Sequence, residues 1–154
     1  MKNIFIIGMM GSWKSTVGKK LAKSLNMHFI DTDDEIEKEA KNTIKDIFND
    51  FGENRFRNLE SEYFQKKAKE IGNVISTGGG IIKNRKNREY LKKNGTTILL
   101  KARPETLSNR IKNIEKRPLL KSQNQLFEIS KIWNQRKQDY ISIAEIIIET
   151  DNLN

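Results

Sequence analysis

The first sixteen residues place a short hydrophobic strand directly before a glycine-containing loop and an amphipathic helix. Residues 4–7 are apolar, and Gly8, Lys14 and Ser15 follow at the spacing of a phosphate-binding loop. In such a loop, backbone N–H groups surround the phosphates, the lysine reaches them, and the hydroxyl binds magnesium. The segment therefore predicts a nucleoside triphosphate site at the end of a buried strand.

Trp13 occupies the position at which this pattern has its second glycine. That glycine adopts a left-handed backbone and passes close to the ligand, and a residue with a Cβ pays roughly 1 to 2 kcal/mol for the same conformation. The loop alone therefore leaves a second interpretation open, in which a strand, a glycine turn and a helix bind no ligand.

Length and composition limit the class of protein. The chain has 154 residues and no cysteine, and it has no apolar stretch long enough for a signal peptide or a membrane span. We therefore expect one domain without disulfides, in the cytoplasm and without a membrane partner.

The net charge of +9 comes entirely from residues 61–154. A nucleic-acid surface at residues 83–88 is one explanation. We expect a solvated helix face instead, and no nucleic acid as partner, because the segment has no interleaved aromatic residues and no base-reading module. A third explanation is that several arginines face an anionic ligand.

Two further expected strands end in residues of the kind that bind ligands. Residues 27–30 lead into Asp31, Thr32, Asp33 and Asp34, and residues 73–76 lead into Thr77 and three glycines. Ligands of open α/β sheets bind at the carboxyl ends of the strands. One aspartate is expected to cap a helix. Asp31 and Asp33, which alternate and so point to the same side, are the candidates for binding magnesium through water and for meeting a substrate hydroxyl.

The three consecutive glycines, Gly78, Gly79 and Gly80, cost more chain entropy than a plain turn requires. The favoured explanation is a ligand that approaches the backbone N–H groups closely.

The remaining pattern predicts helices and two strands beyond those named above. Thr43 is expected to cap a short helix that Gly52 ends, and Pro104 suits the first turn of a later helix. The expected helices are residues 15–25, 44–51, 53–70, 85–93, one beginning at Pro104, and a long one that contains residues 126–140. The expected later strands are residues 73–76, 97–101 and 145–149.

Three arginines stand out on this pattern. Arg57 lies three residues before Glu60 and could pair with it. Residues 114–121 break the helical pattern, as in a cover loop that carries Arg117. Arg136 lies among apolar residues on one helix face, and an arginine in such a place usually has an anionic partner. That face also carries Leu126, Ile129, Trp133 and Tyr140.

Together these segments resemble the shikimate kinases, which belong to the nucleoside monophosphate kinase-like branch of P-loop proteins. The resemblance covers residues 4–149. The matching residues are, in order, Gly8 to Thr16, Asp31-Thr32-Asp33, Gly52-Glu53 with Phe56-Arg57 and Glu60, Thr77 to Gly80, Arg117-Pro118-Leu119-Leu120, and Arg136 with Tyr140.

The resemblance implies an α/β fold of three layers, with a five-stranded parallel sheet flanked by helices. It also implies a small lid at about 112–123 and substrate-binding helices at about 32–62. The implied activity is a kinase of the shikimate pathway of aromatic amino-acid biosynthesis, which transfers the γ-phosphoryl group of ATP to the 3-hydroxyl of shikimate. The implied cofactor is Mg²⁺, and we expect a monomer.

The resemblance also implies a role for each matching residue. Lys14, Asp33 and Arg117 are the implied catalytic residues, and Ser15 and Asp31 would hold magnesium. The nucleotide would meet Gly11, Ser12, Trp13, Lys14, Ser15, Thr16, Arg110 beside adenine, and Arg117. Shikimate would meet Asp33, Arg57, Gly78, Gly79, Gly80 and Arg136, with Glu60 holding Arg57.

Three departures from the family pattern leave alternatives. Trp13 replaces a glycine, Gln138 replaces a proline, and Asn154 lies close to where the family has an adenine-contacting loop. The alternatives are a weakened or non-catalytic relative that binds a ligand, another small-molecule kinase of the same branch such as a gluconate or nucleotide kinase, and a nucleic-acid-binding protein.

Overall fold

The computed structural model describes residues 2–111, 120 and 124–153. Within them lies one five-stranded sheet, in the order β2-β3-β1-β4-β5, and every pair of neighbouring strands is parallel. The strands are β1 (Asn3–Ile7), β2 (His28–Asp31), β3 (Asn73–Ser76), β4 (Gly95–Lys101) and β5 (Ile146–Glu149). The order reverses at β1, which has β3 on one side and β4 on the other, and such a switch point is where parallel sheets form a ligand crevice.

The register aligns the carboxyl ends of β2, β3 and β1 with one another. Ser76 lies opposite Ile6 in β1 and opposite Asp31 in β2. Consequently the segments that begin at Gly8, Thr32 and Thr77 leave the sheet next to one another.

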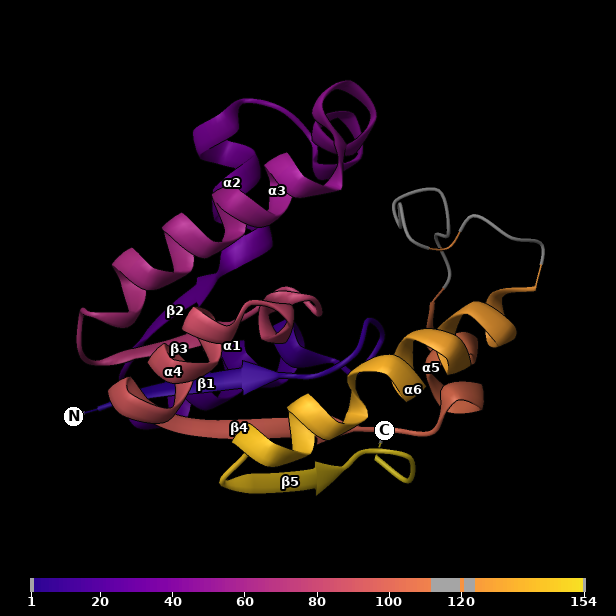
Figure 1. Ribbon diagram of the computed structural model, residues 1–154. Helices are drawn as coiled ribbons and strands as arrows, with labels where there is room; N and C mark the ends of the chain where they lie inside the picture. Colours follow the sequence, from indigo (N-terminus) through magenta and orange to yellow (C-terminus); the bar gives the residue numbers. More distant parts are fainter. Residues whose placement is uncertain (1, 112–119, 121–123, 154) are drawn as a thin grey trace.

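Helices cover both faces of the sheet and form the outer layers (Figure 1). One face carries α1, and the other carries α4 and α6. The pair α2 and α3 pack against each other and project beyond the β2 side of the sheet. The helices are α1 (Lys14–Leu25), α2 (Thr32–Ala40), α3 (Ile44–Ala68), the 3-10 turn η1 (Ile81–Lys83), α4 (Arg85–Asn94), α5 (Pro104–Arg110) and α6 (Gln125–Ile143).

The central strand is buried on both faces, as a sheet with helices on both sides requires. Phe5 and Ile7 belong to the larger core beneath α3, α4 and α6, whereas Ile6 belongs to the smaller core beneath α1. All three side chains are fully buried. The apolar run at residues 4–7 therefore anchors the loop that follows it to the centre of the molecule.

The expected fold class is confirmed, and so are most of the expected elements. Thr43 caps α3 by accepting a hydrogen bond from the backbone N–H of Asp46 at 3.1 Å. The two expected helices at 44–51 and 53–70 form the single element α3, with a break at Gly52, where φ is 82°. Pro104 lies in the first turn of α5. On α6, Leu126 is exposed, so the apolar face begins at Ile129.

No helix in the described ranges is both long and apolar enough to cross a bilayer.

Candidate active site

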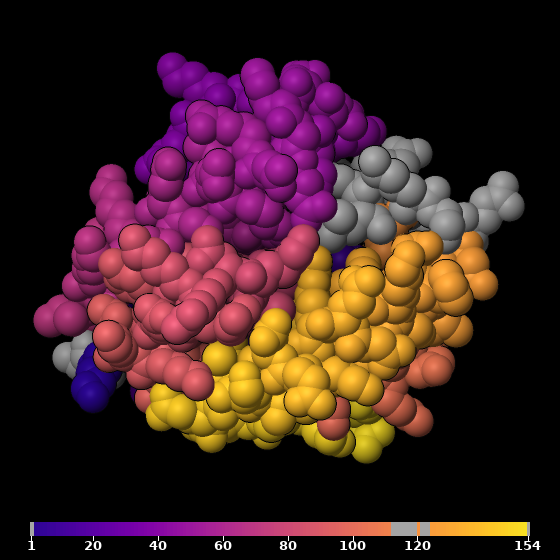
Figure 2. Space-filling view, viewed as in Figure 1, coloured from indigo at the N-terminus to yellow at the C-terminus, as the bar shows by residue number. Residues whose placement is uncertain are grey.

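A cleft of about 810 Å³ opens at the carboxyl ends of β1, β2 and β3, and residues of α1, α2, α3 and α6 line it. In the space-filling view, the purple surface of α2 and α3 lies above the orange and yellow surface of α6 (Figure 2). The cleft gathers most of the residues expected to form the site. Those that line it are Gly11, Trp13, Lys14, Ser15, Thr16, Asp31, Asp33, Arg57, Gly78, Gly79, Gly80, Arg110 and Arg136. Ser12 is wholly buried and is not part of the lining. Arg117 and the expected lid lie outside the described residues, apart from Leu120.

The loop after β1 turns sharply and delivers the N-terminus of α1 to the cleft. Gly8 and Gly11 have φ values of 147° and 78°, and a Cβ on Gly8 would lie 2.4 Å from the carbonyl oxygen of Leu100. Lys14 lies across the loop and donates from Nζ to the carbonyl of Met9 at 2.9 Å. Because the N-terminal N–H groups and the dipole of α1 point into the cleft, this end is suited to phosphate.

Trp13 adopts the left-handed backbone that the sequence pattern demands of this position, with φ 67° and ψ 24°. Its indole ring lies over the guanidinium of Arg110, whose Cζ is 3.5 Å from the ring centroid. The edge of the same guanidinium donates to the hydroxyl of Thr150 at 3.0 Å and to the carbonyl of Thr150. Arg110 is therefore fixed between the indole and the end of β5.

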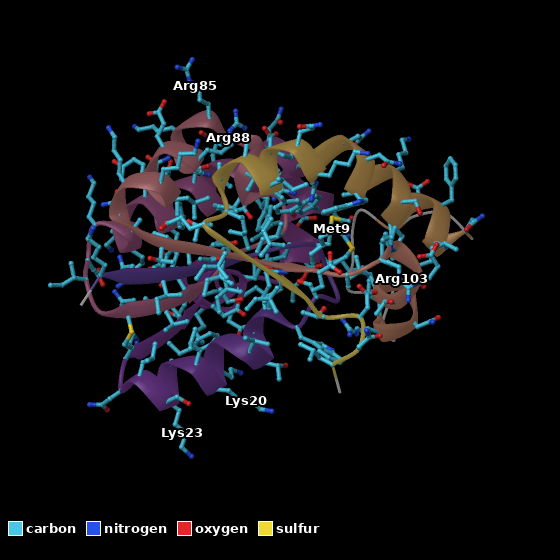
Figure 3. The ribbon with its side chains drawn as sticks, turned by 90° about the horizontal axis from the view of Figure 1, so that it is seen from below. Met9, Lys20, Lys23, Arg85, Arg88 and Arg103 are labelled. Carbon is cyan, nitrogen blue, oxygen red and sulfur yellow. The ribbon has the colours of Figure 1, made fainter. Side chains whose placement is uncertain are left out.

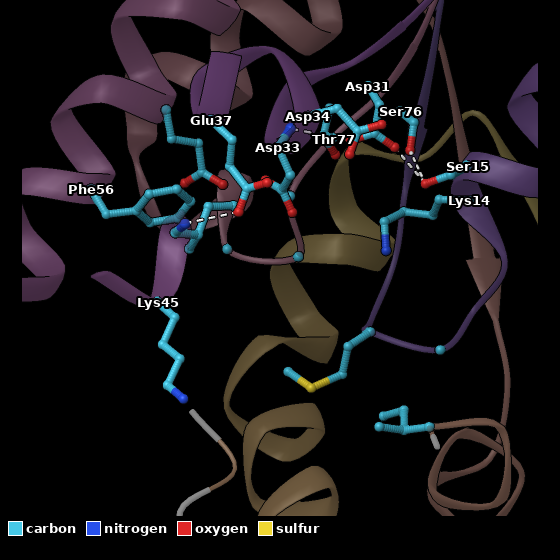
Figure 4. A pocket seen from close by; sticks show the side chains of 18 of the residues that line it. Lys14, Ser15, Asp31, Asp33, Asp34, Glu37, Lys45, Phe56, Ser76 and Thr77 are labelled. Carbon is cyan, nitrogen blue, oxygen red and sulfur yellow. Dashed lines mark hydrogen bonds between the residues drawn. The ribbon is translucent and has the colours of Figure 1, made fainter. Parts of the chain in front are cut away.

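Ser15 and Asp31 form a pair of oxygen ligands beside the loop (Figure 4). Asp31 Oδ2 accepts a hydrogen bond from Ser15 Oγ, and Ser15 Oγ lies 3.5 Å from Ser76 Oγ. Asp31 Oδ1 accepts from the N–H of Asp33 at 3.1 Å, so Asp31 is also the cap of α2.

The pair fits a magnesium ion that arrives with phosphates. Mg²⁺ prefers oxygen ligands and keeps several waters, so one or two protein oxygens suffice when phosphates supply the others. Within the described ranges, no three histidine, cysteine or acidic side chains are grouped so that they could hold a metal ion by themselves. Such a site therefore depends on the nucleotide.

Asp33 reaches the cleft by a different route from the one expected. We expected Asp31 and Asp33 to face the same side because they alternate along an extended segment, but α2 already begins at Thr32. Asp33 instead projects from the first helical turn, and its carboxylate points into the space that Lys14 also enters (Figure 4). The neighbouring Asp34 lines the cleft too, and burial followed by the charge of Asp31 raises its pKa.

The expected pair of Arg57 and Glu60 is confirmed as part of a larger network. Arg57 donates from Nη1 to Glu60 Oε2 at 2.8 Å and from Nε to Glu53 at 3.2 Å, and Glu53 also accepts from Lys83 at 3.0 Å. Glu60 is only 1% exposed. Its burial raises its pKa against the opposing pull of Arg57. Burial would lower the pKa of Arg57, but the two glutamates outweigh it, so this pKa is raised.

Side chains of the chain itself crowd two of the three glycines after β3. A Cβ on Gly78 would lie 2.3 Å from Glu60 Oε1 and 2.8 Å from Asp33 Oδ1, and a Cβ on Gly80 would lie 2.2 Å from Arg57 Nη1. At Gly79 the nearest atom would be 3.4 Å away, which is an ordinary contact. Charged side chains packed on Gly78 and Gly80 therefore give a second reason for glycine at these two positions. The expected close approach of a ligand to the backbone N–H groups stays a prediction, and all three glycines line the cleft.

Arg136 closes the far side of the cleft. It is 7% exposed and donates from Nη1 to the carbonyl of Gly79 at 3.1 Å. The hydroxyl of Tyr140 donates to the same carbonyl, and burial raises the pKa of Tyr140 to about 12. Among the described residues, Arg136 forms no ion pair with a carboxylate. A buried guanidinium on a cleft wall is suited to bind an anionic group of a ligand.

The resemblance implied substrate-binding helices at about 32–62, but it singled out no residue at the start of α3. Ile44, Lys45 and Phe48 line the cleft beside Thr43 and Glu37, and Figure 4 shows Lys45 reaching toward the opening. The cap at Thr43 marked this helix in the sequence, but none of its side chains was assigned to the site.

The basic segment at residues 83–88 does not form a continuous positive surface. Lys83 pairs with Glu53, Arg85 pairs with Glu89 at 3.4 Å, and Arg88 lies 3.6 Å from Asp139. Figure 3 places Arg85 and Arg88 on the side of the molecule opposite Lys20 and Lys23. Three of the four basic side chains in this segment therefore lie beside an acidic side chain, and the absence of a nucleic-acid partner stays a prediction.

Comparison with known proteins gives one consistent family. Residues 10–154 match the family model described as shikimate kinase. A shikimate kinase of Persephonella marina is 44% identical over 151 residues, which cover 98% of this chain and 90% of the relative. A shikimate kinase of Sulfurihydrogenibium is also 44% identical, with 98% and 89% covered.

Solved structures agree with the sequence relatives. The structure described as shikimate kinase from Acinetobacter baumannii in complex with shikimate has a TM-score of 0.95 at 35% identity, and the match covers 97% of this chain and 84% of the other. A gluconokinase from Sinorhizobium meliloti has a TM-score of 0.53 at 16% identity, with 96% and 82% covered, which shows a shared fold alone.

Proposed function

The chain belongs to the shikimate kinase family, and we propose that its cleft transfers the γ-phosphoryl group of ATP to the 3-hydroxyl of shikimate. The observation that carries the proposal is that Lys14, Asp33, Arg57 and Arg136 line one cleft, although they come from α1, α2, α3 and α6. A phosphate site, a carboxylate and two guanidinium groups are what a kinase of a small carboxylated alcohol requires.

At the phosphate end, the loop N–H groups and Lys14 would hold the β- and γ-phosphates. Ser15 and Asp31 would hold magnesium, which when bound neutralises phosphate charge and orients the phosphates. Phosphoryl transfer depends mainly on positioning and on compensation of negative charge, so none of these groups needs to form a covalent bond to the substrate. As the resemblance implies, Arg110 would lie beside the adenine ring and Arg117 over the phosphates.

At the substrate end, Arg136 and Arg57 would bind the carboxylate and ring hydroxyls of shikimate, since a guanidinium donates hydrogen bonds as a fork. The N–H of Gly79 would add a donor between them. Glu60 would hold Arg57 in place through the hydrogen bond of 2.8 Å between them. Asp33 would accept the proton of the attacking hydroxyl, or orient that hydroxyl toward the γ-phosphate.

The proposal includes a monomer in the cytoplasm that needs neither nucleic acid nor a membrane. In its support, a single chain lines both ends of the cleft. Sedimentation at the concentration of the activity assay tests the monomer, and a gel shift in physiological salt tests for nucleic-acid binding.

The test is a coupled assay of ADP release with saturating magnesium-ATP and three acceptors: shikimate, gluconate and CMP. We expect turnover with shikimate and background rates with the other two. Turnover with gluconate or CMP in its place would assign the chain to another kinase of the branch.

A ligand-binding protein without turnover is the second candidate, and the left-handed Trp13 beside Lys14 is the observation that favours it. Calorimetry separates the two candidates. Binding of shikimate without any turnover would support the second one.

A further inference from the structure

The indole of Trp13 covers one face of the Arg110 guanidinium, the group proposed above to lie beside the adenine ring. Arg110 Cζ is 3.5 Å from the centroid of the indole ring, so the ring lies directly on one face of the guanidinium. The edge of the guanidinium is held by Thr150, which is fully buried. The edge of the Arg110 guanidinium is therefore hydrogen-bonded to Thr150, and the indole covers one of its faces.

Both residues line the phosphate-loop end of the cleft. The end of α5 packs closely on the loop, since a Cβ on Gly11 would lie 3.0 Å from the carbonyl of Leu107 and 3.1 Å from Ile111. Arg57 and Arg136 line the same cleft and are the guanidinium groups proposed above to bind the substrate. Of the described side chains that line the phosphate-loop end, Trp13 and Arg110 are the ones that offer a flat surface on which a base can stack.

The base of an incoming nucleotide would meet the indole at the phosphate-loop end of the cleft. Trp13 immediately precedes Lys14, and its own N–H belongs to the loop that would surround the phosphates. The ribose and base of a triphosphate held there must pass beside the Cβ of Trp13. We propose that Trp13 acts as a built-in competitor: its indole occupies the face of Arg110 that the nucleobase uses, and ATP binds only after the indole has left. This inference rests on the proposed function.

The competitor lowers apparent affinity without removing the site. The apparent affinity for ATP equals the intrinsic affinity multiplied by the fraction of molecules in which the indole has left Arg110. From the usual strength of an indole–guanidinium stack, this corresponds to a penalty of about 2- to 30-fold in the dissociation constant of ATP. A ligand with three phosphates and no base needs only the loop, and it pays no such penalty.

The experiment compares magnesium-ATP with magnesium tripolyphosphate by calorimetry, in the unaltered protein and in Trp13→Ala. Alanine removes the indole but keeps a Cβ on the same backbone. We expect ATP to bind Trp13→Ala about 2- to 30-fold more tightly and tripolyphosphate to bind both proteins within about twofold. Trp13→Gly should tighten ATP binding as well. Trp133→Phe, which alters the other tryptophan of the chain, is the control and should leave ATP affinity within about twofold.

Fluorescence of Trp13 in the Trp133→Phe background gives a second measurement that needs no change at Trp13. ATP should shift the emission as the indole leaves Arg110, and tripolyphosphate should not. Unchanged or weaker ATP binding in Trp13→Ala would overturn the inference, and so would equal tightening of both ligands. If neither protein binds ATP but both bind shikimate, the proposed kinase function fails together with it.

Discussion

Replacing Gly80 with alanine should damage the substrate end of the cleft and spare the phosphate end. A Cβ at this position would lie 2.2 to 2.5 Å from three atoms of the Arg57 guanidinium. The backbone of Gly80 has φ −95°, which alanine tolerates, so the strain falls on the contact. Because the guanidinium is the far end of a flexible side chain, it can move away, and the fold should survive.

The expected loss follows from what Arg57 gives up when it moves. Hydrogen bonds to a charged group contribute about 1.5 to 3 kcal/mol, and about 1.4 kcal/mol corresponds to tenfold in binding. If Arg57 binds shikimate as proposed, the dissociation constant of shikimate should rise about 10- to 150-fold. Glu60 also loses its partner at 2.8 Å. Because burial already raises the pKa of Glu60, it can take up a proton, which limits the loss of stability.

Calorimetry with shikimate and, separately, with magnesium-ATP measures the two ends of the cleft. Gly79→Ala is the matched control, because its Cβ would meet nothing closer than 3.4 Å. It should keep shikimate affinity within a few-fold, and ATP affinity should stay within about twofold in both variants. The reasoning is refuted if Gly80→Ala binds shikimate like the unaltered protein, or if Gly79→Ala loses as much.

Three further predictions concern stability, each measured as the free energy of unfolding in urea. Trp13→Gly should be about 1 to 2 kcal/mol more stable than Trp13→Ala, because both lack the indole and only glycine relieves the φ of 67°; equal stability would contradict this. Tyr140→Phe should lose about 0.5 to 1.5 kcal/mol, because it removes the hydrogen bond to the carbonyl of Gly79; an unchanged value would mean that the bond contributes nothing. Burial raises the pKa of Glu60, so this group adds stability below its ordinary value of 4.5 and loses it as the pH rises through the folded pKa. The stability of the unaltered protein relative to Glu60→Gln should therefore fall as the pH rises above 4.5; a difference that grows with pH would contradict this.

Local sequence chemistry was sufficient for most of the fold. Alternation of Phe5, Ile6 and Ile7 between two cores gives a central strand, and the cap at Thr43 and the break at Gly52 were visible because each acts on its immediate neighbours. The same holds for the phosphate loop, where Lys14 and Ser15 follow one strand directly.

Contacts between distant segments were not visible. The sequence gives no sign that Glu60 lies against Gly78, because that contact depends on how α3 packs over the end of β3. Nor does it reveal that Trp13 lies on Arg110, because α5 has first to be placed beside the loop. The family resemblance named Arg57 and Arg136, but the reason for the glycines between them came from the packing.

The two ends of the cleft are therefore built in different ways, and this difference decides how each responds to change. The phosphate-binding loop itself is one continuous segment, residues 8–16, and a single residue in it, Trp13, can alter nucleotide binding through its contact with Arg110. The substrate end is a junction at which α3 and α6 meet the loop after β3: Arg57 lies on Gly80, whereas Arg136 and Tyr140 share the carbonyl of Gly79. A substitution that shifts the backbone of that loop moves side chains from both helices together. Changes at the substrate end should therefore be strongly coupled to one another, and additive with changes at Trp13.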